Sequence, residues 1–294
     1  MIQLKGVGVA LITPFYQSGE VDYPSLRRLL EFVTKEGADY LVVQGTTSEV
    51  PTLSNEEKRK ILDFILEFNQ RKLPVVLGLA GYDTAALVNT IQATNLDGVD
   101  AILSVTPYYN RPQQSGLYAH YMAVADSSPK PVILYNVPSR TGTNLAAATT
   151  LRLAHGHENI IGVKEASGNL SQIMEIIKNK PEGFSVISGD DLMTLPIMAL
   201  GAVGVISVAG NAFPGFMALL VKECLREDFV AAAKVHYQLM DLVNALFLDG
   251  SPAGIKAALN IMGFCENVLR LPLVPVREDV YSTIKEKISA LLAE

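Results

Sequence analysis

The stretch IIGVKEASGN (160–169) places Lys164 at the end of an apolar run that is typical of a buried β-strand. Lysine is almost never buried without a partner, because removing an ammonium ion from water is costly. Glu165 is poorly placed to neutralise it, since successive side chains on a strand point to opposite faces. Burial lowers the pKa of a lysine, and a neutral amine can attack a ketone or an aldehyde to form a Schiff base. We therefore expect Lys164 to be a nucleophile whose imine draws electrons from the neighbouring carbon.

Polar residues also follow other apolar runs of the chain. Thr46 and Thr47 lie in GTTSE, Tyr109 ends VTPYY, and Tyr135 is followed closely by Arg140. Any one of them alone is more often a packing or strand-forming residue. Imine formation, however, needs protons moved in and out, and a tyrosine hydroxyl both donates and accepts a hydrogen bond. We expect Tyr135 and Tyr109, linked through a threonine hydroxyl, to form a proton relay, and the planar fork of Arg140 to bind a carboxylate.

The sequence contains no pattern that is typical of a metal site. The four histidines are scattered, and the pair in AHGHEN (154–159) is typical of a solvated loop. The acidic pair Asp190 and Asp191 follows the seventh run, where many barrels bind phosphate, so it argues against a phosphorylated substrate and is better explained by loop capping. We expect no metal and no cofactor, the covalent lysine imine taking that place.

The elements that must position these residues recur regularly. Eight short β-branched runs lie at 6–15, 40–45, 74–80, 101–109, 131–137, 160–166, 184–190 and 204–211, with helical periodicity between them. Ser54 and Glu57 form a capping box before one of these helices. Eight alternating units predict an α/β fold, a (β/α)8 TIM barrel whose active site lies at the carboxyl ends of the strands. We expect residues 1–226 to form the barrel and residues 227–294 a C-terminal helical domain.

Composition excludes several classes of protein. The net charge is −6 without a block of lysine or arginine, so no nucleic-acid or membrane-surface partner is expected. The uncharged run 192–221 exceeds the length of a membrane span, but prolines and glycines interrupt it, and a buried helix, strand and helix explain it better. Cys224 and Cys265 lack metal-ligand spacing and suit buried, inert thiols in a reducing compartment. Without a signal-like N-terminus, the chain is expected in the cytoplasm.

Over nearly its whole length the chain resembles the pyruvate-dependent class I aldolases of the dihydrodipicolinate synthase and N-acetylneuraminate lyase family. The motifs GTTSE, VTPYYNRP, ILYNVPSRTG, IIGVKEASGN, SGDD and GVISV occur in family order. The resemblance implies that Lys164 forms the imine with pyruvate and that Tyr135 donates and accepts the proton. It also implies that Thr46 and Tyr109 complete the relay, Tyr109 reaching in from a neighbouring subunit of a homotetramer.

Further roles are implied for the substrates' carboxylates. Thr47 and the backbone of Ile206 would hold the carboxylate of pyruvate. YYNRPQQSGLYAHY and YNVPSRTG are more similar to the dihydrodipicolinate synthase branch, in which Arg140 would receive the carboxylate of L-aspartate 4-semialdehyde. Two alternatives remain open: a lyase of N-acetylneuraminate or a 2-keto-3-deoxy sugar acid using the same imine, and a non-catalytic barrel that binds a keto acid.

The chain departs from the family pattern in three places. Ser48 replaces a glycine beside the pyruvate-binding threonines, and GSPAGIKAAL only partly matches the family's NPxPVK stretch; we expect activity to survive both. Members inhibited by lysine carry a serine, histidines and a glutamate where this chain has Val50, Asn55, Lys58 and Ala86, although Tyr108 matches. We therefore expect weak or absent feedback by lysine.

Overall fold

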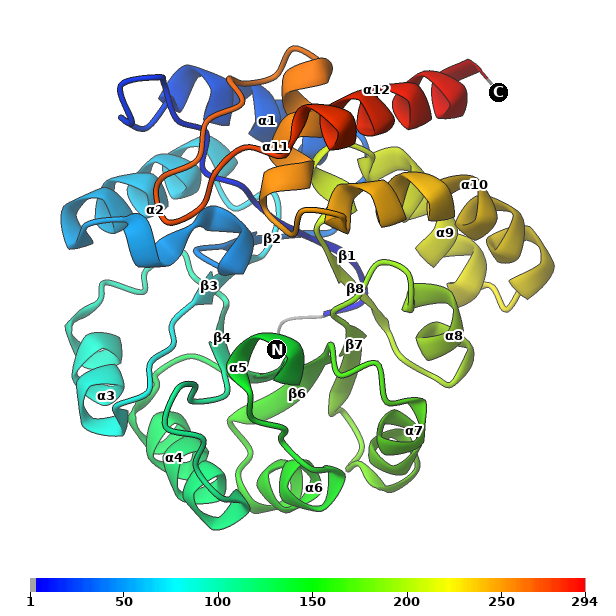
Figure 1. Ribbon diagram of the computed structural model, residues 1–294. Coiled ribbons are helices and arrows are strands. Elements are labelled where there is room, and N and C mark those ends of the chain that lie inside the picture. Colours follow the sequence, from blue (N-terminus) through cyan, green and yellow to red (C-terminus); the bar gives the residue numbers. More distant parts are fainter. Residues whose placement is uncertain (1–3, 294) are drawn as a thin grey trace. The chain divides into compact units, whose positions relative to one another are not determined.

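The computed structural model describes residues 4–293. Its strands form a closed barrel in sequence order, and the paired neighbours run parallel (Figure 1). The prediction of a (β/α)8 barrel is thus confirmed. The strands are β1 (Gly6–Ala10), β2 (Tyr40–Val43), β3 (Val75–Gly78), β4 (Ala101–Val105), β5 (Val132–Asn136), β6 (Ile160–Glu165), β7 (Ser185–Ser188) and β8 (Gly204–Ser207).

Helices alternate with the strands and continue after the last one. They are α1 (Tyr23–Lys35), α2 (Asn55–Asn69), α3 (Thr84–Ala93), α4 (Gln114–Ser127), α5 (Pro138–Thr141), α6 (Ala147–Gly156), α7 (Leu170–Asn179), α8 (Thr194–Ala199), α9 (Pro214–Leu225), α10 (Phe229–Phe247), α11 (Ala253–Ile261) and α12 (Glu278–Ala293), with short 3-10 turns η1 (Thr46–Ser48), η2 (Val50–Thr52) and η3 (Ala209–Asn211). The predicted capping box is present, because Ser54 and Glu57 bond each other's backbone at the start of α2.

The strands are shorter than the apolar runs that predicted them. In the first run only Gly6–Ala10 is a strand, yet Leu11, Ile12 and Phe15 beyond it are at most 2% exposed. The Leu11 N–H still donates to the Val42 carbonyl of β2 at 3.0 Å, whereas the Ile12 N–H donates to a side chain, Asn211 Oδ1, at 3.1 Å. An apolar run in the sequence indicates buried residues, and burial continues beyond the last residue of the strand. The run therefore overestimates the length of the strand.

Contacts divide the chain into two compact units. One is built mainly from Pro74–Ile206 and contains β3–β7 and most of β8; the other combines Gly6–Leu73 with Ser207–Glu294. In the second unit α10 packs against α9, α11 and α12 (Figure 1). All the helices from α10 onward lie beyond residue 227, while the division into a barrel of 1–226 and a helical domain of 227–294 stays a prediction.

The uncharged run 192–221 is divided among α8, β8 and α9, as the sequence predicted. Over residues 4–293, none of the helices combines the length and the apolar character that crossing a membrane requires.

Candidate active site

Lys164 lies on β6 with 5% of its surface exposed. Its Nζ atom is 4.4 Å from the centroid of the Tyr135 ring, and the two residues are register partners on β6 and β5. Of the ion pairs among residues 4–293, none involves Lys164. The sequence-predicted nucleophile and proton carrier are therefore brought together, with the amine over an aromatic face instead of a carboxylate.

Room for the lysine depends on a glycine after β7. A Cβ atom on Gly189 would lie 2.9 Å from Cε and 3.0 Å from Cγ of Lys164. The Gly189 N–H also donates to the Glu165 carbonyl at 2.7 Å, which fixes its backbone beside β6. Any side chain at position 189 would therefore force Lys164 or Ala166 to shift.

The loop after β2 carries the two threonines. Thr46 is exposed and Thr47 is 3% exposed, both in η1. Within this loop the left-handed conformation falls on Gln44 and Glu49 and not on Ser48. The Ser48 hydroxyl donates to the Leu11 carbonyl at 2.7 Å. The backbone at position 48 is therefore not in the left-handed conformation that favours glycine, and serine can replace the family's glycine there without strain.

Tyr109 and Arg140 lie on the loops after β4 and β5. Tyr109 is 89% exposed and has φ 71°, a left-handed conformation that costs a bulky residue free energy. The neighbouring Tyr108 packs edge to face on Tyr82, with ring centroids 5.3 Å apart. Arg140 belongs to α5 and is exposed, whereas Ile206 on β8 is 1% exposed.

Sequence reasoning missed a second buried lysine. Lys256 on α11 is fully buried; its Nζ atom pairs with the Glu49 carboxylate, donates to the Val268 carbonyl at 2.9 Å and lies 4.2 Å from the centroid of the Phe15 ring. Burial alone therefore does not distinguish a nucleophilic lysine from a structural one. The sequence signals are the lysine in SPAGIK and the glutamate in GTTSE, two charged residues within largely uncharged stretches.

The residues considered for metal binding have local roles. Asp190 accepts hydrogen bonds from the backbone of Leu192 and Met193, as expected for loop capping. His155 bonds the Asn179 carbonyl and His157 bonds Asp126. Within residues 4–293 no group of three or more histidine, cysteine or acidic side chains is arranged to hold a metal ion.

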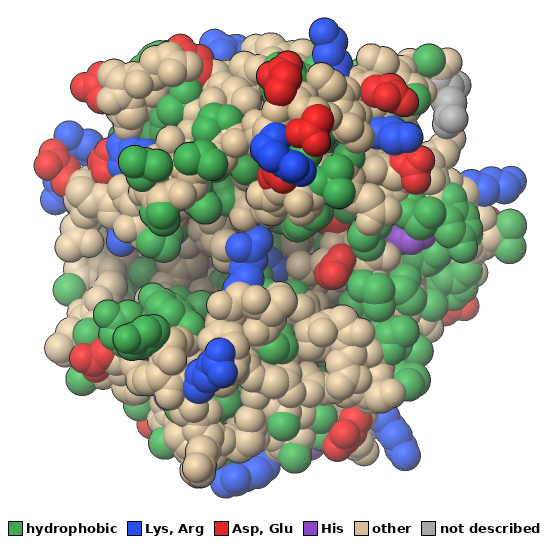
Figure 2. Space-filling view, viewed as in Figure 1, with side chains coloured by type: hydrophobic (Ala, Val, Ile, Leu, Met, Phe, Trp, Pro, Cys, Tyr) green, Lys and Arg blue, Asp and Glu red, His purple; other side chains and the backbone are tan. Residues whose placement is uncertain are grey.

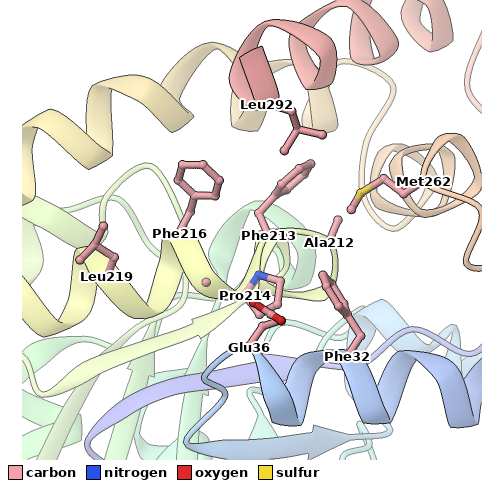
Figure 3. A pocket seen from close by; sticks show the side chains of 10 residues that line it. Phe32, Glu36, Ala212, Phe213, Pro214, Phe216, Leu219, Met262 and Leu292 are labelled. Atoms are coloured by element: carbon pink, nitrogen blue, oxygen red, sulfur yellow. The ribbon is translucent and has the colours of Figure 1, made fainter. Parts of the chain in front are cut away.

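An apolar cavity of about 410 Å³ lies in the second unit. Figure 3 shows Phe32, Phe213, Met262 and Leu292 turned toward it, from α1, from the residue before α9, from the end of α11 and from α12. Among the described residues that line it, Glu36 alone is charged, and none of the predicted site residues lines it. We assign this cavity no part in catalysis.

The fold and the Lys164–Tyr135 pair define a class: a (β/α)8 barrel with a buried amine near the carboxyl end of the sixth strand. The model of the dihydrodipicolinate synthetase family matches residues 3–291, and the chain belongs to that family. The 4-hydroxy-tetrahydrodipicolinate synthase of Parabacteroides distasonis is 52% identical over 290 residues, covering 99% of this chain and 98% of that protein.

Solved structures agree with this assignment. The dihydrodipicolinate synthase of Aquifex aeolicus is 42% identical with a TM-score of 0.94, covering 98% of each chain. The chloride-inhibited enzyme of Acinetobacter baumannii, solved in complex with pyruvate, is 36% identical with a TM-score of 0.95 and covers 98% of this chain and 99% of that one.

Proposed function

We propose that this chain is a 4-hydroxy-tetrahydrodipicolinate synthase, a lyase of lysine biosynthesis that condenses pyruvate with L-aspartate 4-semialdehyde. Full-length identity of 52% to a relative of that name supports the activity. The single observation that carries the mechanism is the buried Lys164 amine, unpaired with any carboxylate among the described residues and 4.4 Å from the centroid of the Tyr135 ring. The neutral amine attacks the ketone carbon of pyruvate, as a lysine nucleophile does in an imine-forming enzyme.

Proton transfers accompany each step. The attack gives a carbinolamine, and loss of its hydroxyl as water, with a proton delivered from Tyr135, gives the protonated imine. Tyr135 suits this task because a phenol both donates and accepts hydrogen bonds. A proton then leaves the methyl carbon, and the resulting enamine attacks the aldehyde carbon of the second substrate. The amino group of that substrate finally closes on the imine carbon and releases Lys164, so that one water is formed overall.

The other predicted residues are assigned to binding and to the relay. Thr47 and the backbone of Ile206 hold the carboxylate of pyruvate, and Thr46 links Tyr135 to Tyr109. Arg140 receives the carboxylate of the semialdehyde, to which a guanidinium offers two parallel hydrogen bonds. The Acinetobacter baumannii relative was solved in complex with pyruvate, which supports pyruvate as a substrate of this chain.

Trapping tests the imine directly. The protein is incubated with pyruvate, reduced with borohydride, digested and analysed by peptide mass. We expect a reduced pyruvate adduct on Lys164 and none on Lys256, which serves as an internal control because it is buried in an ion pair. Lys164→Arg should abolish the adduct. An adduct elsewhere, or none, would refute the mechanism.

The second substrate separates the rival activities. Assays with pyruvate plus aspartate semialdehyde are compared with cleavage of N-acetylneuraminate and of 2-keto-3-deoxy sugar acids, and we expect turnover only in the first. Arg140→Ala should weaken the apparent affinity for the semialdehyde; an unchanged affinity would remove the role given to Arg140. A barrel that binds pyruvate without turning over any of these substrates would support the non-catalytic alternative.

We also propose that the chain works as a homotetramer in the cytoplasm. An 89% exposed tyrosine in a strained conformation supports a Tyr109 that acts in a neighbouring subunit. Figure 2 shows hydrophobic side chains gathered over α9 and α10 at the right of the view, where Leu219, Phe229, Val230, Tyr237 and Met240 are exposed. Two free, buried cysteines suit a reducing compartment.

Mixing two inactive variants tests the shared site. Chains with Lys164→Arg and chains with Tyr109→Ala are each expected to be inactive. If Tyr109 serves the neighbouring site, hybrids of the two contain sites with both native residues and regain activity. No recovery in verified hybrid oligomers would refute the exchange, and sedimentation of the native protein tests the tetramer.

Lysine inhibition tests the remaining expectation. Members inhibited by lysine carry a serine, histidines and a glutamate where this chain has other residues. A cationic effector would here meet the positive charge of Lys58 and find no carboxylate partner, so we expect weak or absent inhibition by lysine. A submillimolar inhibition constant in the condensation assay would refute this.

A further inference from the structure

Glu165 and Asn136 are both fully buried, and they follow Lys164 and Tyr135 directly on β6 and β5. One oxygen of the Glu165 carboxylate accepts hydrogen bonds from Asn136 Nδ2 and from Gln172 Nε2, both at 2.9 Å. The other oxygen accepts from the Ser167 hydroxyl at 2.6 Å and from its backbone N–H at 3.2 Å. The carboxylate is thus held by neutral donors.

Asn144 closes these contacts into a ring. Asn136 Nδ2 also donates to Asn144 Oδ1 at 2.9 Å, and Asn144 Nδ2 donates to Gln172 Oε1 at 2.8 Å. Asn136 Oδ1 accepts from the Leu145 N–H at 2.9 Å, and this backbone donor fixes which way the Asn136 amide faces. We call Asn136, Asn144, Glu165 and Gln172 the amide ring. Each hydrogen bond of the ring joins one defined donor to one defined acceptor. Exchanging an amide for a carboxylate, or the reverse, at one position therefore brings two donors or two acceptors together.

The amide ring lies across the strand pair that carries the reacting groups. Tyr135 pairs with Lys164, and Asn136 pairs with Glu165 in the next step of the register. Successive side chains point to opposite faces, so the ring acts from the face opposite the amine and the phenol. It also joins the residues after α5 to the first turn of α7. The hydrogen bonds of the amide ring therefore hold the carboxyl ends of β5 and β6 together. Tyr135 and Lys164 lie at these ends, so the same hydrogen bonds fix the distance between the phenol and the Nζ atom.

We propose that Glu165 and Asn136 are positioning residues for Lys164 and Tyr135. This inference rests on the imine mechanism proposed above. The carboxylate touches neither amine nor substrate; it holds the two strand ends in the spacing that imine formation needs. A displacement of about 1 Å in such a geometry costs on the order of 100-fold in rate. The expected effect is therefore on the rate of adduct formation at saturating pyruvate and not on the apparent affinity for pyruvate.

Reversing the direction of the ring provides the sharpest test. Asn136→Asp faces one carboxylate with another. Glu165→Gln directs an amide NH2 group either at those of Asn136 and Gln172 or, turned over, at the backbone N–H of Ser167. In the double variant the new amide at position 165 donates to the new carboxylate at position 136. If Asn144 and Gln172 also flip their amides, the four side chains again pair donors with acceptors, and the backbone N–H of Leu145 keeps its partner. The Leu145 carbonyl loses only the long hydrogen bonds at 3.3 and 3.5 Å from Gln172 and Asn136.

The rate of trapping by borohydride is measured for each variant, with unfolding midpoints alongside. Each single exchange is expected to slow adduct formation at least about 10-fold, and the double variant to return to within about 3-fold of the native rate. Ser167→Ala is the matched control, because it removes a donor from the other oxygen of the same carboxylate. It should lower stability while leaving the trapping rate unchanged.

Each outcome decides between roles. Single variants that trap pyruvate at the native rate, or a double variant no faster than a folded single, would overturn the positioning role. A Ser167→Ala variant slowed in proportion to its loss of stability would reduce the amide ring to a structural element. If the single variants do not fold, the double variant and Ser167→Ala still decide. A native chain that forms no adduct would instead overturn the proposed mechanism, and this inference with it.

Discussion

Removing one partner of the buried Lys256–Glu49 ion pair in the second unit should destabilise the protein strongly. Lys256→Met keeps most of the side-chain length but leaves the Glu49 carboxylate without its cation. This carboxylate has no exposed surface, and among the described residues its remaining donor is the Arg270 backbone N–H at 3.0 Å. Glu49→Gln leaves an ammonium ion that retains the Val268 carbonyl and the Phe15 ring. Burial already lowers the pKa of Lys256, against the effect of Glu49. Breaking such a pair costs about 3–5 kcal/mol.

The magnitude is measured by urea unfolding at pH 7 and matched protein concentration. Lys60→Met is the control, because Lys60 and Glu56 form a 2.7 Å pair whose side chains are 58% and 66% exposed. That loss should be much smaller than either single loss at the buried pair, because solvent screens an exposed ion pair. The double variant Glu49→Gln and Lys256→Met should lose less free energy of unfolding than the sum of the two single losses, because no buried charge is left without its partner. Single losses below about 1 kcal/mol, or strict additivity, would refute the reasoning.

Three further predictions concern single side chains. Burial lowers the pKa of His120 to about 4, so that below about pH 6.5 the unfolded chain takes up a proton that the folded chain does not. The free energy of unfolding should therefore fall between pH 6.5 and 4, by about 3 kcal/mol in total. A His120→Gln variant whose stability falls as steeply over this range would contradict the prediction. Burial raises the pKa of Cys224 and Cys265 to about 11, so a thiol reagent at pH 8 should label them only after unfolding; rapid labelling of the native protein would refute their inertness. Gly189→Ala places a methyl group 2.9 Å from Cε of Lys164 and should slow imine trapping at least about 10-fold in a folded protein, whereas a native trapping rate would show that the lysine has room to move.

Much of the fold could be predicted because burial leaves a direct trace in the sequence. Strands of a parallel barrel are covered on both sides, so each appears as an apolar run, and the eight runs indicated the eight strands. Their ends could not be predicted in the same way. Ile12 is as apolar and as buried as a strand residue, yet its N–H donates to the side chain of Asn211 and not to a neighbouring strand, because burial and strand pairing are separate requirements.

The candidate site shows the same division. The sequence indicated Lys164 and Tyr135 because each reactive side chain stands at the end of an apolar run. It did not indicate that Lys256, 207 residues from Glu49, would be buried beside that carboxylate. Nor did it indicate that Glu165, Asn136, Asn144 and Gln172 close a hydrogen-bonded ring. Such partners depend on the direction of side chains from separate elements.

The sequence by itself determined the alternation of strands and helices, the family and the placement of an amine in an apolar strand, because these follow from the local order of residue types. Only the tertiary structure decided which of the two buried lysines stands beside a phenol and which beside a carboxylate. The physical reason is that burying any lysine is costly, and the neighbour that compensates this cost is brought in by folding from elsewhere in the chain.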